Sequence, residues 1–454
     1  MVAPTLVLRQ TGGSARLVTS APPRQAIRSF ALSVAALPDP TLQLSVVAQG
    51  GLGDGIARLP TGEVVLVAGA VSGDVVLAAL GPKLRGVRRA ELRTVIAASP
   101  DRAVPPCAAF GVCGGCDLQH LTLAAQHQHK LVQLQRIIGE RGPTVQLKSV
   151  TPEGHRRRMR VHLRQAAAGP VVGFLAQKSD AVAVAAHCLA LVPALEAVRR
   201  LLPEVLGRAV FKGELHAIVG AEGVIAALTG LPLRDAPLPQ PQHWARALGL
   251  VGLRWQLGPL RDAWGIDTVA LPEIAAPWQV RVHGDGFCQA SAAANVALRQ
   301  AVAAALTQTD AAAAAIEFFA GAGNFTDLLL AGGRDVLAVE RDERACALLR
   351  GSAVAAGSAG KLTVAHTEVA AACRNLPPAG LWLLDPGRLG APEVAAAAAR
   401  HRPSAIVYVS CALDTLSRDL TTLRAAGYRI AQATLVDAFP WTVHAESVVV
   451  LQHD

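Results

Sequence analysis

The chain has 454 residues, 52% of them apolar, and a formal net charge of +9; this length suggests about three domains. Its eight cysteines are too few and too unevenly spaced for a secreted disulfide scaffold, and no apolar run is long enough to cross a bilayer. Most basic residues are Arg, which suits phosphate contacts, although a genome bias toward Ala, Gly and Arg explains the same excess. We therefore expect a cytoplasmic monomer without membrane contact, with nucleic acid as one candidate partner.

The first 38 residues contain Arg but no Asp or Glu, and the first acidic residue is Asp39. This composition resembles that of a transit peptide. A disordered extension and a start codon assigned too early are simpler explanations. We therefore expect residues 1–40 to be a disordered extension.

Between residues 41 and 98 the sequence consists of short β-rich runs separated by Gly, Asp and Pro. The runs are LQLSVVAQG, GIARLP, EVVLVAGAV and DVVLAAL. Several short strands at this spacing are typical of a small all-β barrel. We expect an OB-like barrel here, followed by the Pro-rich connector ASPDRAVPPCAAF.

The segment 99–275 opens with a cluster of cysteines. Cys107, Cys113 and Cys116 form the pattern Cx5CxxC beside glycines, and Cys188 lies further along as a possible fourth ligand. Four thiolates suit either zinc or a [4Fe–4S] cluster, and the spacing does not decide between them. The Cx3CxxC spacing of radical S-adenosylmethionine enzymes is absent. We expect an α+β central domain whose cysteine loop binds a metal.

Further along this segment, residues Arg156 to Arg164 read RRRMRVHLR, in which basic and apolar residues alternate. This alternation predicts a strand with one Arg-rich face. Such a strand is either a solvated edge strand protected by its charges or a strand that faces RNA. The sequence leaves both interpretations open.

From residue 276 to 454 the pattern becomes strand, turn and helix in repetition. The runs that read as buried strands with their exits are AIEFFAGAGNFT, DVLAVERDE, LTVAHTE, LWLLDPGR, AIVYVSCA, YRIAQATLVDAFP and AESVVVLQ. Ala-rich helical stretches lie between the earlier ones. This order predicts an open, mostly parallel α/β sheet of the Rossmann-like type.

Three strand ends carry features of a nucleoside site. Gly321 and Gly323 follow the first of these strands and allow a tight turn with close backbone approach to a ligand. Glu340 ends the next strand, where an acid can bind both ribose hydroxyls. The full GxGxxG is absent, so a single nucleoside such as S-adenosylmethionine fits better than NAD. Asp385 ends the fourth strand, at the edge where open α/β sheets hold ligands. An ordinary βα turn with a surface acid is the structural alternative.

The strand IVYVS ends at Cys411, which is either core filler or a nucleophile. Glu446 precedes the final apolar strand, so it shares a rim with Cys411 only if that strand is antiparallel. His444 is more simply an ordinary core or surface histidine. The remaining isolated cysteines are expected to be small buried hydrophobic residues: Cys288, Cys346 and Cys373.

In this order, the motifs resemble those of the RNA 5-methyluridine (uracil-C5) methyltransferase family, RumA/TrmA type, from about Leu42 to the end of the chain. The motifs are the Cx5CxxC with its distal cysteine, FAGAGNF, LDPGR, YVSC with TLSRD, and FP with HAES. The barrel resembles a TRAM domain, an RNA-binding module. The resemblance implies a class I S-adenosylmethionine-dependent methyltransferase domain over 276–454.

The resemblance also implies roles for individual residues. Cys411 would be the nucleophile and Glu446 the base. The S-adenosylmethionine contacts would be Gln289, Phe319, Asn324, Glu340 and Asp385. A [4Fe–4S] cluster would be held by Cys107, Cys113, Cys116 and Cys188. The expected substrate is 23S ribosomal RNA, because TRAM-like barrels are commoner among the ribosomal members; transfer RNA is the alternative.

The chemistry of uracil supports this interpretation independently. Uracil C5 is a poor nucleophile toward a methyl sulfonium, so a thiolate must first add to C6. A general base must then remove the C5 proton before the thiolate leaves. Two other classes of methyltransferase carry a different motif after the fourth strand. Some cytosine-5 methyltransferases have Pro-Cys there, and amine methyltransferases often have Asp-Pro-Pro followed by an aromatic residue. This chain has DPGR, which contains neither the Cys nor the aromatic residue. A catalytically silent iron–sulfur RNA-binding protein is the third alternative, and the presence of both Cys411 and Glu446 argues against it.

Several positions depart from the family's usual pattern, three of them beside predicted site residues. Ala412 follows the cysteine where Asn is common, Gly387 replaces Pro or Ala, and Ser291 stands where Asn is usual. None of these departures removes a catalytic group. They bear on substrate choice and on affinity for the cofactor.

Overall fold

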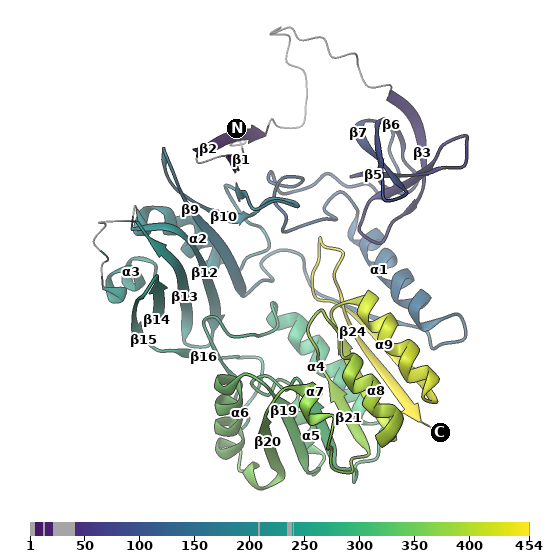
Figure 1. The fold of residues 1–454 in the computed structure, drawn as a ribbon, viewed down its shortest axis with the longest axis vertical. Helices are drawn as coiled ribbons and strands as arrows, with labels where there is room; N and C mark the ends of the chain where they lie inside the picture. Colours follow the sequence, from purple (N-terminus) through teal and green to yellow (C-terminus); the bar gives the residue numbers. More distant parts are fainter. Residues whose placement is uncertain are drawn as a thin grey trace. The chain divides into compact units, whose positions relative to one another are not determined.

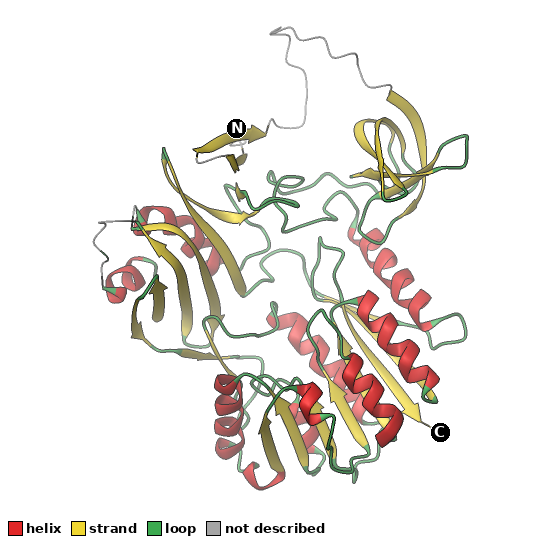
Figure 2. Cartoon of the chain, viewed as in Figure 1, coloured by secondary structure: helices red, strands yellow, loops and turns green. Residues whose placement is uncertain are grey.

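The computed structural model describes residues 5–11, 14–20, 41–207, 209–233, 238 and 240–453. Figures 1 and 2 show the helices and strands of the chain. The chain folds into two compact units. Unit 1 contains residues 1–129, 166–188 and 441–443, and unit 2 contains residues 130–165, 189–440 and 444–454. Within the described ranges, no helix has both the length and the apolar character needed to cross a membrane.

The first part of unit 1 is a closed barrel in the order β3-β4-β5-β7-β6. Its strands are β3 (Thr41–Gln49), β4 (Gly55–Arg58), β5 (Val64–Ala68), β6 (Val75–Leu84) and β7 (Val87–Ala97). Alternate residues such as Val65 and Val67 are fully buried, because side chains in a strand alternate between its two faces. The barrel predicted from the β-rich runs is confirmed.

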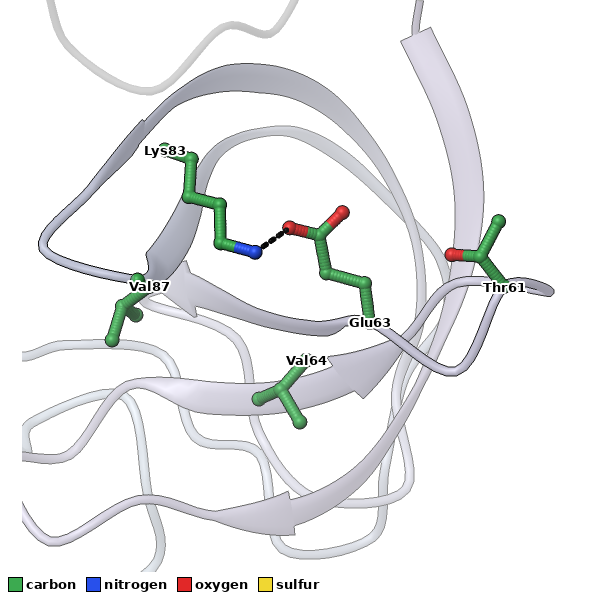
Figure 3. Close-up of a pocket in the computed structure, with 6 residues that line it drawn as sticks. Thr61, Glu63, Val64, Lys83 and Val87 are labelled. Carbon is green, nitrogen blue, oxygen red and sulfur yellow. Dashed lines mark ion pairs between the residues drawn. The ribbon is translucent and has the colours of Figure 1, made fainter.

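This barrel carries a pocket that is separate from the predicted site residues (Figure 3). The pocket is lined by Thr61, Glu63, Val64, Lys83, Gly86 and Val87. Lys83 Nζ lies 3.2 Å from Glu63 Oε1, so the two charges in the pocket neutralise each other. No residue of the predicted active site lines it, and it contributes nothing to the candidate site.

Two further strands of unit 1 lie within residues 1–40. Strands β1 (Thr5–Thr11) and β2 (Ser14–Ser20) pair antiparallel, and β1 also pairs with β11 (Val182–Val184), which pairs with β10 (Gly169–Leu175). The prediction of a disordered extension does not account for β1 and β2. Two runs rich in Thr, Val and Leu, separated by two glycines in the sequence, are a hairpin signal that the unusual composition obscured. The rest of 1–40 lies outside the described residues.

The central part of unit 2 is a mainly antiparallel sheet in the order β15-β14-β13-β12-β9. Its strands are β9 (Arg158–Ala166), β12 (Val210–Gly220), β13 (Gly223–Pro232), β14 (Gly252–Leu257) and β15 (Leu260–Gly265). Helix α2 (Pro193–Leu206) contacts β12, and α3 (Pro241–Ala247) contacts β14 and β15. A two-stranded sheet of β16 (Thr268–Ala270) and β17 (Arg281–His283) follows. The predicted α+β character of the central region is confirmed.

The C-terminal part of unit 2 is an open α/β sheet in the order β20-β19-β18-β21-β22-β24-β23-β8. Its strands are β18 (Ala315–Phe318), β19 (Val336–Glu340), β20 (Leu362–His366), β21 (Leu381–Leu384), β22 (Ala405–Ser410), β23 (Tyr428–Asp437), β24 (Glu446–His453) and β8 (Gln146–Ser149). Strands β18 to β22 are parallel, whereas β24 is antiparallel to β22 and β23. Strand β8, from the central segment of the sequence, pairs parallel with β23.

Helices cover both faces of this sheet (Figure 1). Those on the face of Val407 and Val409 are α4 (Ala292–Leu306), α5 (Thr326–Ala331) and α6 (Glu343–Ala355). Those on the face of Ile406 and Tyr408 are α7 (Val369–Ala372), α8 (Pro392–His401), α9 (Leu413–Ala425) and the last turns of α1 (Leu123–Ile138). A short 3-10 turn, η1 (Ala359–Lys361), leads into β20. Because both faces are covered, β22 is buried at every position, which explains its unbroken apolar run and confirms the predicted sheet.

Candidate active site

The carboxyl ends of the parallel strands form one rim of the C-terminal sheet. Phe319 follows β18, Glu340 ends β19, Asp385 follows β21 and Cys411 follows β22. Parallel strands bring these ends to the same edge, which is where open α/β sheets bind their ligands. Four residues that the sequence singled out separately therefore share one rim.

Glu446 reaches this rim because β24 runs antiparallel to its neighbours. It is the first residue of β24, and the register of β22 with β24 places Ser410 opposite Ser447. Cys411 and Glu446 are each one residue further out on these two paired strands. The Ser447 hydroxyl donates to the Ser410 carbonyl oxygen at 3.2 Å and fixes this end of the pair. The sequence predicted that Glu446 shares a rim with Cys411 only if the final strand is antiparallel, and β24 is antiparallel to β22.

Burial keeps both of these groups mainly neutral near pH 7. Burial, with Asp385 nearby, raises the pKa of the Glu446 carboxyl to about 8. Burial, together with Glu446 and Asp385, raises the pKa of the Cys411 thiol to about 12. The Arg388 guanidinium lowers both pKa values, because a positive charge favours the carboxylate and the thiolate. Within the described part of the chain, Glu446 Oε2 is buried without a hydrogen-bond partner.

The loop after Asp385 is held against the segment that carries Cys411. Burial raises the pKa of Asp385 to about 7, and the residue as a whole is half-buried. Asp419, on the helix that starts just after Cys411, is 1% exposed and accepts a hydrogen bond from the Ala391 N–H at 2.8 Å. The same carboxylate accepts from the Tyr408 hydroxyl at 2.7 Å. Asp419 thus ties the loop to the strand and helix that flank Cys411.

The turn after β18 has a backbone suited to close approach by a ligand. Phe319 has a φ of 60°, in the left-handed region that residues other than glycine rarely adopt, and Gly321 and Gly323 have φ values of 56° and 95°. A Cβ on Gly323 would lie 2.6 Å from Leu349 Cδ1, so the site requires glycine. Glu340 Oε2 accepts the Gly321 N–H at 2.9 Å and holds the turn against the end of β19.

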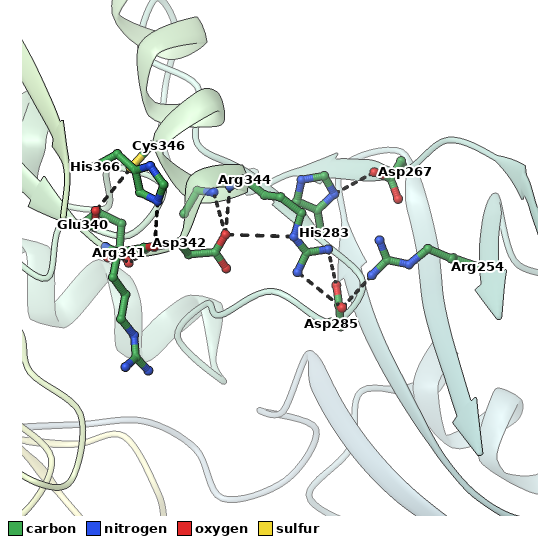
Figure 4. A network of polar contacts seen from close by, with 11 residues as sticks. Arg254, Asp267, His283, Asp285, Glu340, Arg341, Asp342, Arg344, Cys346 and His366 are labelled. Carbon is green, nitrogen blue, oxygen red and sulfur yellow. Dashed lines mark hydrogen bonds and ion pairs between the residues drawn. The ribbon is translucent and has the colours of Figure 1, made fainter. Parts of the chain in front are cut away.

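Glu340 also belongs to a network that connects the central and C-terminal sheets of unit 2 (Figure 4). Its Oε1 accepts the next two backbone N–H groups at 2.7 and 2.8 Å. Asp342 caps α6 by accepting the Arg344 N–H at 2.9 Å, and the Arg344 side chain pairs with Asp285 at 3.2 Å. Asp285 also pairs with Arg254 of β14 at 2.5 Å. Three backbone amides occupy the Glu340 carboxylate, which has about four acceptor sites, so it retains capacity for a ribose hydroxyl.

The two amide residues of the predicted cofactor set come from different segments. Gln289 is 6% exposed and precedes α4, whereas Asn324 lies in the turn after β18. Asn324 pairs with Asn295 of α4 through two amide hydrogen bonds, each 2.9 Å long. Ser291, one of the departures from the family's pattern, caps α4 by accepting the Ala294 N–H at 3.2 Å. The helix that follows Gln289 therefore keeps a defined start.

The cysteine loop of unit 1 does not assemble a metal site in this arrangement. The four predicted ligands are all half-buried and outside disulfides: Cys107, Cys113, Cys116 and Cys188. Cys113 packs with Ala181 and Ala183 around the β10–β11 hairpin, and the Gly115 N–H donates to its Sγ at 3.4 Å. Among the residues that the structure describes, however, no three His, Cys, Asp or Glu side chains form a group able to hold a metal ion. The predicted zinc or [4Fe–4S] site is therefore not supported by the geometry. Three isolated cysteines of unit 2 are buried as predicted: Cys288, Cys346 and Cys373.

Comparison with known proteins identifies the family. Residues 380–454 match the family described as tRNA (uracil-5-)-methyltransferase. The chain is 32% identical over 422 residues to the 23S rRNA (uracil(1939)-C(5))-methyltransferase RlmD of Halomonas elongata, a match that covers 88% of this chain and 87% of that one. The chain belongs to the RNA uracil-C5 methyltransferase family. The RlmD enzyme of Acidithiobacillus ferrooxidans is 34% identical over 422 residues, covering 88% and 94% of the two chains.

A solved structure shows the same fold for this member of the uracil-C5 methyltransferase family. The tRNA (uracil-54, C5)-methyltransferase of Pyrococcus abyssi, in complex with S-adenosyl-L-homocysteine, superposes with a TM-score of 0.70 at 21% identity, covering 90% of this chain and all of that one. The predicted fold class and family are confirmed.

Several residues of the site could not be identified from the sequence. One is Arg388, which lowers the pKa of Cys411. The others are Arg157, Glu273 and Asn295, which form hydrogen bonds around Gln289 and Asn324. None of these residues stands in a motif of its own. A polar residue at a helix position whose neighbours are apolar, as Asn295 is, was the one available signal.

Proposed function

We propose that this protein transfers a methyl group from S-adenosylmethionine to C5 of a uridine in RNA, with Cys411 as the nucleophile and Glu446 as the general base. The observation that supports this most directly is the pairing of β22 with β24, which brings a thiol and a carboxyl to one rim. A uracil ring bound between them would present C6 to one group and the C5 proton to the other. Asp385 and Arg388 adjust the charge on both groups.

In this proposal, Cys411 must ionise before it acts, since only the thiolate adds to C6. Arg388 favours that ionisation. The addition makes C5 nucleophilic, and S-adenosylmethionine supplies the methyl group to it. Glu446 in its ionised form then takes the C5 proton, and the C6–S bond breaks to return the Cys411 thiolate. Because burial raises the pKa of Glu446 to about 8, this base is poised close to neutral pH.

We assign the cofactor to the rim beside these groups. Glu340 would bind ribose, and the left-handed turn at Phe319 would admit the nucleoside close to the backbone. Gln289, Asn324 and Asp385 would supply the remaining polar contacts. The S-adenosyl-L-homocysteine named with the Pyrococcus abyssi structure supports a nucleoside thioether as the ligand class for this fold.

The RNA would contact a basic face of the central sheet. In the register of β9 with β12, Arg164 lies opposite Lys212, and Arg158 and Arg160 share that face because side chains alternate along a strand. The Arg158 guanidinium lies 5.8 Å from the ring centroid of Phe287, which is 69% exposed. An exposed aromatic ring beside cations suits single-stranded RNA. This favours the RNA-facing interpretation of the Arg-rich strand.

We propose 23S ribosomal RNA as the substrate, because the two RlmD relatives carry that substrate in their names over most of the chain length. Transfer RNA, named for the Pyrococcus abyssi protein, is the second candidate. We further propose that the protein acts as a monomer, which light scattering during the assay would check.

An iron–sulfur cluster is a separate proposal, supported by the Cx5CxxC pattern and the distal Cys188. Iron and sulfide analysis of anaerobically purified protein tests it. If a cluster is structural, Cys113→Ser loses iron and folded yield together. Stable Cys113→Ser protein that binds RNA but has lost activity would contradict a structural role.

The deciding experiment is methyl transfer from tritiated S-adenosylmethionine to separate pools of unmodified ribosomal and transfer RNA, with nucleoside analysis. We expect label in 5-methyluridine with wild type and none with Cys411→Ala. We expect near wild-type activity with the matched control Cys373→Ala, because Cys373 is a buried residue, 4% exposed, at the C-cap of α7. Label in 5-methylcytidine would show that the target base is cytosine and not uracil. No label from protein that binds both RNA and cofactor would refute the methyltransferase assignment.

A further inference from the structure

A continuous chain of side-chain hydrogen bonds runs beneath the two amide residues of the proposed cofactor site. Arg157 Nε donates to the main-chain carbonyl oxygen of Gln289 at 3.0 Å, and Arg157 Nη1 donates to Glu273 Oε2 at 2.6 Å. Asn295 Nδ2 donates to Glu273 Oε1 at 2.8 Å and to Asn324 Oδ1 at 2.9 Å. Asn324 Nδ2 donates back to Asn295 Oδ1 at 2.9 Å.

Three members of this chain have buried side chains, and the members come from distant parts of the sequence. The side chains of Arg157 and Glu273 are 5% and 6% exposed, and Asn295 is fully buried. Arg157 is 132 positions from Gln289, and Asn295 is 29 positions from Asn324. A buried ion pair is a weak source of stability, because desolvation offsets its attraction, whereas its fixed geometry can orient neighbouring groups. Orientation is the function that this arrangement suits.

The hydrogen-bond directions leave Asn324 one orientation. A carboxylate only accepts, so Glu273 forces Asn295 to present its amide nitrogen to it. Asn295 then has one N–H and its oxygen left for Asn324, and the reciprocal pair fixes which end of the Asn324 amide faces it. One N–H of Asn324 remains outside the pair. Arg299 holds the main chain at the same point by donating to the Asn324 carbonyl oxygen while paired with Asp327 at 2.6 Å.

We propose that Asn295 and Glu273 are positioning residues of the cofactor pocket, which rests on the proposed role of Asn324 and Gln289 in binding S-adenosylmethionine. Glu273 orients Asn295, and Asn295 in turn orients Asn324 so that one Asn324 N–H can donate to an acceptor atom of the cofactor. Through Arg157 they hold the segment of Gln289 in place. Neither residue touches the reacting atoms, so their loss weakens cofactor binding rather than the chemical step.

The test is calorimetric titration of S-adenosylmethionine, beside steady-state kinetics, on wild type, Asn295→Leu and Glu273→Gln. We expect Asn295→Leu to raise the dissociation constant and KM by about tenfold, the effect of one hydrogen bond lost from its proper direction, while kcat changes by less than about twofold. In an Asn324→Ala background, Asn295→Leu should add no further loss, because the residue it acts through is gone. Glu273→Gln provides a second route if Asn295→Leu does not fold.

A control must separate positioning from general destabilisation. Arg199 of α2 is 4% exposed and forms an ion pair with Glu196 at 2.6 Å. Glu196→Gln therefore also removes a carboxylate that pairs with a buried arginine, but at a place away from the rim. We expect Glu196→Gln to lower stability without changing cofactor affinity. Unchanged affinity in both Asn295→Leu and Glu273→Gln would overturn the positioning role, as would a full additional loss in the Asn324→Ala background. Wild type that binds no S-adenosylmethionine would instead refute the proposed function itself.

Discussion

The steric demand at Gly323 provides a sharp test of the turn after β18. A Cβ added there would lie 2.6 Å from Leu349 Cδ1 and 3.1 Å from Trp278 Cζ2. Leu349 is fully buried and Trp278 is 4% exposed, so neither has room to move away. The Trp278 indole also donates to the Gly323 carbonyl oxygen at 3.1 Å, which resists displacement of the turn. Gly323→Ala therefore requires the packing beneath the turn to shift.

The neighbouring glycine supplies a matched control. Gly321 also has a positive φ, 56° against 95° for Gly323, but a Cβ on it meets nothing within 4 Å. We expect Gly321→Ala to cost about 1 kcal/mol from backbone strain alone. Gly323→Ala should cost about 3 kcal/mol, because overpacking a buried site adds about 1–3 kcal/mol to the same strain.

Urea unfolding followed by tryptophan fluorescence measures this difference, and titration of S-adenosylmethionine checks the pocket. We expect the midpoint to fall clearly further for Gly323→Ala than for Gly321→Ala, with weaker cofactor binding in the former. Equal midpoints for the two variants would refute the argument that contact with Leu349 and Trp278 requires glycine at this position.

Three other perturbations test separate parts of the site. The raised pKa of Glu446, about 8, means that its burial costs stability increasingly as pH rises from about 4.5 to about 8. Glu446→Gln should therefore differ least from wild type near pH 4 and exceed it in urea midpoint at pH 9. The same variant, lacking the base, should accumulate an RNA adduct that survives denaturing electrophoresis, and an adduct-free, fully active variant would rule out the assigned role. Arg160→Ala should weaken RNA binding and reduce its salt dependence by about one counterion, and an unchanged slope would place the RNA elsewhere. Asp419→Asn should lower kcat with little change in cofactor affinity, because it loosens the loop after Asp385 through the contacts with Ala391 and Tyr408; single-turnover rates equal to wild type would contradict this.

The sequence predicted those parts of the fold whose signals are local. Unbroken apolar runs ending in polar residues marked the parallel strands, and a strand's end places Asp385 or Cys411 at the rim whichever neighbour the strand pairs with. The direction of β24 was different, since an apolar run reads alike in both directions. The placement of Glu446 could be stated only as a condition, which the observed pairing with β22 fulfils.

Features that depend on long-range pairing could not be predicted from local patterns. Strand β8 is four residues long, QLKS, and joins the C-terminal sheet only through its pairing with β23, far along the chain. The contacts of Glu273 with Arg157 and Asn295 likewise join residues more than twenty positions apart. Hydrogen bonds of this kind carry no sequence period, so no pattern search reveals them.

The acidic character of the rim leads to a final prediction about the cofactor's charge. S-adenosylmethionine carries a sulfonium cation, whereas S-adenosyl-L-homocysteine has a neutral thioether in its place. Burial raises the pKa of Asp385 to about 7, so this carboxyl gains its negative charge as pH rises through neutrality. If Asp385 binds the cofactor as proposed, a carboxylate attracts the sulfonium and not the thioether. The ratio of the two affinities should therefore shift toward S-adenosylmethionine between pH 6 and pH 8.

Calorimetric titration of both ligands at these two pH values measures the ratio, in which contacts common to the two molecules cancel. Asp385→Asn removes the titrating charge, and we expect its ratio to be flat across the same range. Glu446, with a pKa of about 8, would add a smaller rise at the upper end, which Glu446→Gln would remove. A wild-type ratio that does not change with pH would show that the sulfonium lies outside the field of Asp385. The assignment of this carboxyl to the cofactor would then have to be withdrawn, while the roles of Cys411 and Glu446 would stand.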